Sequence, residues 1–230
     1  MTLTSSDLWI IVVAAIAYLM GSFPTAYYVT KWAIGSNIQS SGSGNVGAMN
    51  CYRLIKDEKS TTLGIIGFVT VLLGDMGKGV LAIFVAKWLS FLGYGLLPAF
   101  VAGSFFVVLG HNYSVFFKFK SGGRGISSIG GALLALNPLA FAAGISTLLL
   151  CIVMFQHLFI ARVNWSRFSD VFSVVGSQVL GRVLGLALAL VPLYFFGPEV
   201  FFPILAADIL VLMKHVERVK AFIQELSRPK

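Results

Sequence analysis

The sequence predicts an all-α protein: a polytopic membrane helix bundle with about seven transmembrane helices, forming a single integral-membrane domain over residues 1–230. Hydrophobic residues make up 57% of the chain and charged residues only 11%, whereas soluble globular proteins carry about 25% charged residues. The mean hydropathy is +0.89. The apolar residues also form blocks close to the roughly 20 residues that a helix needs to cross a bilayer. Most of the protein surface must therefore face lipid.

Seven apolar blocks, separated by short polar islands, are the expected spans. The first is too long for a signal-peptide core and no basic residue precedes it, so we expect it to be retained. Polar residues 74–79 interrupt the second block. The fourth and seventh are short, which is tolerated where a segment is packed in protein or lines a wet cavity. The expected spans are residues 8–29, 63–93, 96–117, 126–136, 139–160, 171–191 and 200–213.

The basic residues are distributed unevenly between the turns. If the N-terminus lies outside, 14 of the 17 Lys and Arg residues fall on inner segments, and the turns near residues 94, 137 and 197 carry none. Because cytoplasmic loops carry an excess of Lys and Arg, this predicts an outside N-terminus and a cytoplasmic C-terminus. The asymmetry, or an anionic substrate, accounts for the net charge of +8. Nucleic acid is not an expected partner, since no basic stripe, zinc-finger spacing or RNA-binding signature is present.

The first inner island, residues 40–53, is rich in Gly, Ser and Asn. Its glycines match the GxGxxG pattern, but a membrane helix precedes them and no acidic residue follows at the spacing that dinucleotide binding requires. Glycines let backbone N–H groups converge on an anion, and an arginine can bind a phosphate or carboxylate through two N–H groups. A flexible polar loop is the alternative. The candidate binding residues are Ser43, Gly44, Asn45, Asn50 and Arg53.

The second inner island begins with Gly110 and His111 and ends in a glycine-rich turn that opens the fourth span. Free N–H groups and the helix dipole make such a turn an anion site. The alternative is that its cations only anchor the helix end, but glycine on both sides of Arg124 is costly without a close backbone approach. The GK[ST] ending of a Walker loop is missing. The candidate residues are Lys118, Lys120, Gly122, Gly123, Arg124 and Gly125.

Ionisable residues also occur within the spans and at their ends, where they suggest function by default. Asp75 and Lys78 lie three residues apart on one helix, so they are either substrate-binding residues or a structural pair. Arg182 has no motif around it and is interpreted as structural. His215 lies where the last span meets water, with Asp208 seven residues earlier on the same face. No His, Cys, Asp or Glu cluster has metal-binding spacing, so no metal is expected.

The C-terminal residues continue an apolar pattern at helical spacing beyond the last span. This predicts an amphipathic cytoplasmic tail helix over residues 213–227, lying along the inner leaflet. The basic residues of this tail would then contact anionic lipid.

Taken in order, these motifs resemble the bacterial acyl-phosphate:glycerol-3-phosphate acyltransferases over nearly the whole chain. The resemblance rests on residues 18–24, 42–50 with Arg53, 75–79 and 110–125, and more weakly on 167–173 and the tail at His215. It implies a seven-span enzyme of the bacterial cytoplasmic membrane, without metal or nucleotide cofactor and with its active site on the cytoplasmic side. Such an enzyme acylates the 1-hydroxyl of glycerol 3-phosphate, the first acylation of phospholipid synthesis. Its acyl phosphate comes from a soluble partner enzyme.

Three positions depart from the pattern of that family. Arg124 stands where the family has Lys, Met49 where it has Thr, and Arg218 where its tail has Asn. The change at position 124 keeps the charge but alters its geometry. An arginine at position 218 is able to bind the acceptor phosphate, or it faces lipid headgroups with Lys220.

The resemblance assigns two phosphates to the two glycine loops. Residues 122–125 would bind the donor phosphate, and Ser43, Asn45, Arg53 and His215 would bind glycerol 3-phosphate. The base for the hydroxyl stays open among His215, His111 and a substrate phosphate. The expected catalytic residues are thus His215, His111, Ser43 and Arg53.

Two other classes of function compete with this interpretation. A secondary transporter of an anionic solute would need inverted repeats and a site at the bilayer midplane, but no internal repeat is found and the islands lie on one side. A membrane scaffold leaves the cationic glycine loops unexplained.

Overall fold

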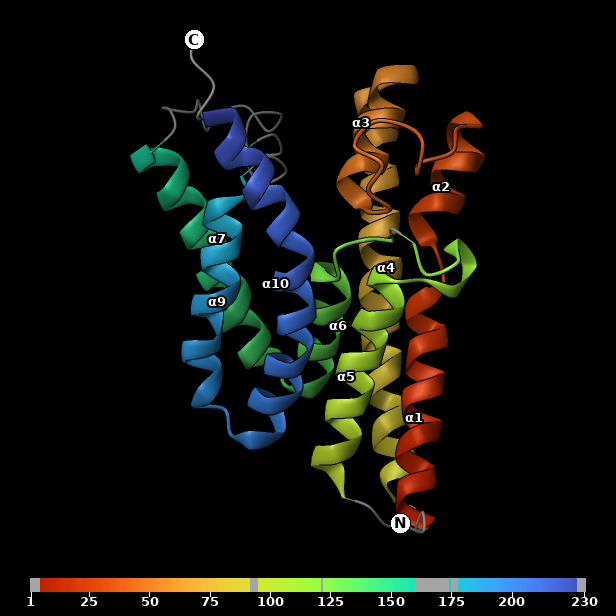
Figure 1. Ribbon diagram of the computed structural model, residues 1–230, viewed down its shortest axis with the longest axis vertical. Coiled ribbons are helices and arrows are strands. Elements are labelled where there is room, and N and C mark those ends of the chain that lie inside the picture. Colours follow the sequence, from red (N-terminus) through yellow and green to blue (C-terminus); the bar gives the residue numbers. More distant parts are fainter. Residues whose placement is uncertain (1–4, 92–94, 121, 160–173, 175–177, 227–230) are drawn as a thin grey trace.

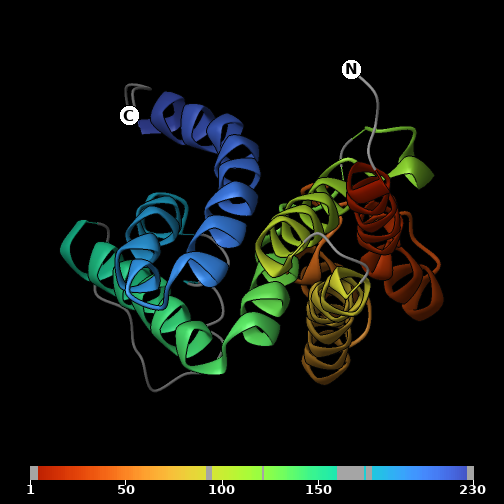
Figure 2. The ribbon, with the colours of Figure 1, turned by 90° about the horizontal axis from the view of Figure 1, so that it is seen from below.

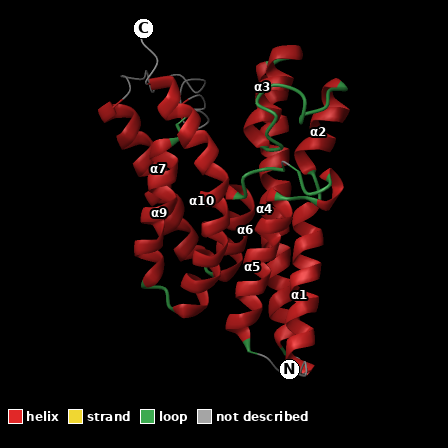
Figure 3. Ribbon diagram, in the orientation of Figure 1, coloured by secondary structure: helices red, strands yellow, loops and turns green. Residues whose placement is uncertain are grey.

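In the described residues of the computed structural model, 5–91, 95–120, 122–159, 174 and 178–226, all regular secondary structure is helical (Figure 3). The helices form two groups (Figures 1 and 2). One contains α1 to α5, the other contains α7, α9 and α10, and α6 lies between them. The bounds are α1 Ser5–Ser22, α2 Thr25–Ile34, α3 Ala48–Glu58, α4 Thr61–Ser90, α5 Leu96–Asn112, the 3-10 turn η1 Val115–Phe117, α6 Ile126–Leu136, α7 Pro138–Phe159, α9 Leu180–Tyr194 and α10 Pro198–Leu226.

The described helices have the length and composition of a multi-pass membrane protein. Four segments are long and apolar enough to cross a bilayer: Leu8–Ile34, Thr61–Ser90, Leu96–Phe117 and Pro138–Phe159. Helices α6 and α9 are apolar but shorter. Large apolar side chains of the long helices are exposed, among them Leu19 on α1, Leu73 on α4 and Leu139 on α7. Such exposure is expected of a surface in contact with lipid.

The first predicted span, residues 8–29, is not one helix. It breaks at Phe23 and Pro24 into α1 and α2, because proline lacks an N–H group and disfavours helical geometry in the residue before it. The carbonyl groups freed by the break find new donors. The Phe23 carbonyl accepts from Lys78 Nζ at 2.5 Å, and the Ser22 carbonyl accepts from Ser114 Oγ at 2.6 Å.

The second predicted span is not interrupted at residues 74–79, since α4 runs through them as a continuous helix. Gly79 of this stretch serves helix packing instead. A methyl group on Gly79 would collide with the Ser128 carbonyl of α6, and one on Gly131 of α6 would collide with the Met76 carbonyl of α4. Small residues that let backbones approach closely are typical of membrane helix interfaces.

The last two predicted spans differ in their limits from the described helices. Of the helix expected at 171–191, the structure describes α9, which extends from Leu180 to Tyr194; residues 160–173 and 175–177, including the polar group at 167–170, lie outside the described residues. The tail expected at 213–227 is helical as far as the described residues extend, and it forms the end of α10, which continues without a break to Leu226.

The polar islands gather at one end of the bundle. In Figure 1 the loops after α2 and after α5 lie toward the same end as the C-terminus of α10, and the N-terminus lies at the opposite end. The chain thus has one polar end at which a shared site can form.

Candidate active site

A cavity of about 310 Å³ lies where the two helix groups meet at the polar end. Four arginines of the described part of the chain line it, and each comes from a different part of the fold. Arg53 lies on α3, Arg124 in the loop before α6, Arg182 on α9 and Arg218 on α10. We call this space the arginine cavity. Ser43, Asn45 and Asn50 of the first loop also line it.

The arginines of this cavity repel one another. Burial, followed by the charges of Arg218, Arg182 and Arg53, lowers the pKa of Arg124 to about 9. Burial and the charge of Arg53 likewise lower the pKa of Arg218. Among the described residues that line the cavity, Asp75 is the only carboxylate, and Lys78 pairs with it at 2.6 Å. A bound anion would offset this repulsion, so the cavity is suited to phosphate groups.

The two glycine loops predicted as anion sites lie against each other. The Val46 N–H group donates to the Gly122 carbonyl at 3.4 Å, and the Gly122 N–H group donates to the Asn112 carbonyl at 3.2 Å. Gly125 has the left-handed conformation, with φ of 85°, and caps α6. The second loop therefore does open a helix, and residues 124–127 at the start of that helix line the arginine cavity. The N–H group of Gly123, like that of Gly122, already donates to a carbonyl, that of His111, and neither glycine lines the cavity.

Asn50 organises the first loop. Its side-chain amide donates to the carbonyls of Ile38 and Ser41 at 3.3 and 3.1 Å, and its Oδ1 accepts from the Ser43 N–H group at 3.1 Å. Gly42 and Gly44 both have positive φ in this loop, where glycine is least costly. Asn50 thus holds Ser43 and Asn45 at the cavity by fixing the backbone between them and α3.

Asp75 and Lys78 form the buried ion pair that was one of the two predicted alternatives. Lys78 Nζ contacts Asp75 Oδ1 at 2.6 Å and the Phe23 carbonyl at 2.5 Å. His111 Nδ1 lies 3.9 Å from the same Asp75 oxygen. Lys78 is absent from the lining of the arginine cavity, whereas Asp75 and His111 line it. The pair therefore connects the α1–α2 break to α4, and its Asp75 carboxylate lies beside His111.

The two candidate histidines lie in different places. His111 lines the arginine cavity. His215 is fully buried, at 0% exposure, and does not line it; its Nδ1 lies 2.8 Å from the Val211 carbonyl. His215 is therefore not open to the cavity in this structure, contrary to the prediction that it reaches the aqueous site.

Lys118 and Lys120 also lie away from the arginine cavity, although sequence grouped them with Arg124. Both side chains are exposed and neither lines the cavity. Lys118 and Phe119 have positive φ values of 53° and 61°, an uncommon conformation for residues other than glycine. This turn directs the two lysines outward before the chain returns to Gly122.

Arg182 is a cavity residue that the sequence interpretation missed. It was assigned a structural role because no motif surrounds it, yet it lines the arginine cavity on α9. The signal available in the sequence was its position within an apolar block, where an ionisable residue suggests function by default.

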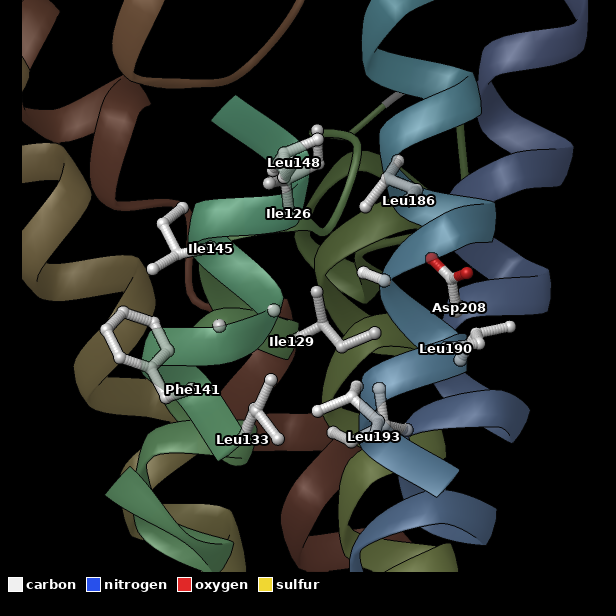
Figure 4. A pocket seen from close by; sticks show the side chains of 14 residues that line it. Ile126, Ile129, Leu133, Phe141, Ile145, Leu148, Leu186, Leu190, Leu193 and Asp208 are labelled. Carbon is white, nitrogen blue, oxygen red and sulfur yellow. The ribbon is translucent and has the colours of Figure 1, made fainter. Parts of the chain in front are cut away.

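An apolar groove adjoins the arginine cavity. It lies between α6, α7, α9 and α10, and it shares Ile126, Ile145 and Leu148 with the cavity. Figure 4 shows its wall of aliphatic side chains together with one carboxyl group, that of Asp208. The remaining lining residues are Ile129, Gly130, Leu133, Phe141, Gly144, Leu186, Ala189, Leu190, Leu193 and Ile204. Fold and site together define a multi-pass helical membrane protein that can hold an anionic head and an apolar tail in adjoining spaces.

Comparison with known proteins agrees with this class. The family model for glycerol-3-phosphate acyltransferase matches residues 11–225. The glycerol-3-phosphate acyltransferase of Desulforudis audaxviator is 32% identical over 190 residues, which cover 82% of this chain and 89% of that relative. For the enzyme of that name from Clostridioides difficile the identity is 30%, with 80% and 86% covered. For glycerol-3-phosphate acyltransferase 2 of Moorella thermoacetica it is 41%, but the match spans only 58% of this chain and 61% of that relative.

The fold is shared with a solved membrane protein. The structure of PlsY (YgiH), an integral membrane glycerol 3-phosphate acyltransferase, in its glycerol 3-phosphate form has a TM-score of 0.66 at 22% identity, covering 96% of this chain and 95% of that one. Its lysophosphatidic acid form has a TM-score of 0.65. The chain therefore belongs to the glycerol-3-phosphate acyltransferase family, a family of membrane acyltransferase enzymes.

Proposed function

We propose that this protein transfers an acyl group from acyl phosphate to the 1-hydroxyl of sn-glycerol 3-phosphate, giving 1-acyl-glycerol 3-phosphate and inorganic phosphate. The observation that carries the proposal is that the arginine cavity and the apolar groove adjoin, with Ile126, Ile145 and Leu148 lining both. An acyl phosphate has an anionic head and an apolar tail, and the acceptor brings a second phosphate. Four arginines in one cavity match two phosphate groups.

The reaction needs positioning and charge stabilisation more than covalent catalysis. The acceptor oxygen attacks the acyl carbonyl carbon and forms the new ester bond. The bond between that carbon and the phosphate oxygen breaks, and phosphate leaves with its electron pair. The hydroxyl proton passes to a base, for which His111 or a substrate phosphate is the candidate at the cavity surface.

The donor phosphate is assigned to Arg124 and the start of α6, because residues 124–127 line the cavity and Ile126 also lines the groove. Glycerol 3-phosphate is assigned to Ser43, Asn45, Arg53 and Arg218, which also line the cavity. Arg182 lies on α9 beside the groove residues Leu186 and Ala189, so it would bind the donor. His215 does not line the cavity, so it would act indirectly, by helping to position the arginines that do.

The same proposal places seven spans in a bacterial cytoplasmic membrane, with the N-terminus outside and the site on the cytoplasmic side. A soluble enzyme that makes acyl phosphate would supply the donor. Cysteine labelling tests the orientation in a variant lacking Cys51 and Cys151. A membrane-impermeant maleimide should modify Lys120→Cys only after permeabilisation and Glu199→Cys without it. The opposite pattern would overturn the orientation.

The proposed reaction is tested with purified protein, acyl phosphate and glycerol 3-phosphate, with the lipid product identified by mass spectrometry. We expect 1-acyl-glycerol 3-phosphate to form only when both substrates are present. Acyl-CoA in place of acyl phosphate is the control for donor choice. Product formation from acyl-CoA but not from acyl phosphate would overturn the proposed donor.

A further inference from the structure

The wall of the apolar groove carries a carboxyl group that the proposed reaction does not use. Asp208 is only 2% exposed, and neither of its oxygens has a hydrogen-bond partner among the described residues. Figure 4 shows its carboxyl group between the aliphatic side chains of Leu186 and Leu190. A buried polar group without a hydrogen-bond partner destabilises the protein, and a charged one does so more strongly. A ligand that supplies the missing hydrogen bond would therefore be bound more favourably than one that does not.

Asp208 shares one face of α10 with residues that reach the arginine cavity. The residues Ile204, Asp208, Val211, His215 and Arg218 follow one another at spacings of three and four, so they form a single stripe along the helix. Arg218 lines the arginine cavity, and Ile204 and Asp208 line the groove. Ten residues separate Asp208 from Arg218, which corresponds to roughly 15 Å along the helix axis.

A water molecule is a poor partner for Asp208. A buried water needs two to four polar partners. Among the described residues that line the groove, Asp208 has the only polar side chain, and the others are Ile, Leu, Phe, Ala and Gly. An unsubstituted acyl chain would leave the carboxyl group unpaired. A hydroxyl group on the chain would satisfy it in either protonation state, because a hydroxyl both donates and accepts.

We propose that the groove is a binding site for an acyl chain that carries a hydroxyl group near its middle, with Asp208 as the hydrogen-bonding partner. This inference rests on the proposed acyl transfer and names the class of donor: a hydroxylated acyl phosphate. The distance from Arg218 places the hydroxyl well away from the reacting carbonyl. A site built around a substrate hydroxyl discriminates strongly against the analogue without it, because its own polar group is then left unpaired.

The test compares octadecanoyl phosphate with positional isomers that carry one hydroxyl, from beside the carbonyl to the middle of the chain. We expect at least one mid-chain isomer to exceed the unsubstituted donor in kcat/KM by about tenfold or more. In Asp208→Leu this ratio should fall to one or below. Ile209→Leu is the matched control, since Ile209 is 51% exposed on the outer face of α10, and it should keep the wild-type ratio.

A binding measurement separates this inference from the proposed reaction. Thermal unfolding in detergent is followed with free octadecanoic acid and with its mid-chain hydroxy isomers, so no turnover is needed. Stronger protection by a hydroxylated acid in the wild type, lost in Asp208→Leu or, if that variant does not fold, in Asp208→Val, supports the site even if acyl phosphate is not the donor. Equal protection by both acids, or an unchanged preference in the variant, would overturn it.

Discussion

Gly123 packs directly against the ring of His111. The Gly123 N–H group donates to the His111 carbonyl at 3.0 Å, and a methyl group on Gly123 would overlap His111 Nε2. The glycine loop and the cavity histidine are therefore fitted to each other, and a change in one displaces the other.

The first prediction follows from this contact. Gly123→Ala should lower kcat/KM by about 100-fold, because the added methyl moves both the loop and the His111 ring from the reacting groups. Gly77→Ala is the matched control, since a methyl there meets no atom within 4 Å. Steady-state kinetics with both substrates measure the effect. Wild-type kinetics in Gly123→Ala would show that this loop is not part of the active site.

The second prediction separates the two histidines. His111 lines the arginine cavity, whereas His215 is buried and does not line it, so we expect His111→Ala to lower kcat by about 100-fold or more, as the loss of a general base does. His215→Ala should act mainly on KM, through the arginines around it. A normal kcat in His111→Ala, together with a strongly reduced kcat in His215→Ala, would show that His215 rather than His111 acts as the base.

The third prediction concerns the arginine that departs from the family pattern. Arg218→Ala should raise the KM for glycerol 3-phosphate about tenfold, equivalent to roughly 1.4 kcal/mol, with the KM for acyl phosphate little changed. Lys220→Ala is the control, because Lys220 lies on the exposed side of α10, 3.9 Å from Glu217. Unchanged acceptor kinetics in Arg218→Ala would assign Arg218 to the membrane surface.

The fourth prediction concerns the buried pair of Asp75 and Lys78. Asp75→Ala should destabilise the protein by about 3 to 5 kcal/mol, because it leaves the buried Lys78 charge without its partner. The double variant Asp75→Leu with Lys78→Met should recover much of that stability. Unfolding in detergent measures both. If Asp75→Ala is as stable as the wild type but binds substrate poorly, the pair belongs to the binding site rather than to the scaffold.

The broad architecture was predictable because the bilayer imposes it. Long apolar blocks predicted the membrane class, and the islands of residues 40–53 and 110–125 do meet at one end of the bundle. The break at Pro24 was signalled by the proline itself, but the apolar run around it favoured a single span. Helix α4 continues through the glycine-rich stretch, where Gly79 packs against α6 and Gly131 of α6 packs against α4. No local sequence pattern reveals this contact between helices.

The site was predictable where a motif placed charge beside glycine. Ser43, Asn45, Arg53, Arg124 and His111 all line the arginine cavity. Arg182 lacked such a motif, because α9 brings it to the cavity only through tertiary packing. The outward course of Lys118 and Lys120 depends on two left-handed residues, and the burial of His215 depends on the continuation of α10 past the expected end of its span.

The most direct test of the central claim, that the arginine cavity is where the acyl group is transferred, is phosphate release from acyl phosphate by purified protein. It is measured with and without glycerol 3-phosphate, in the wild type and in the Arg53→Ala, Arg124→Ala, Arg182→Ala and Arg218→Ala variants. We expect release to require glycerol 3-phosphate and to fall by about tenfold or more in kcat/KM for each variant, since each loses a charge-assisted contact to a phosphate. Release that is independent of glycerol 3-phosphate, or wild-type kinetics in all four variants, would contradict the claim.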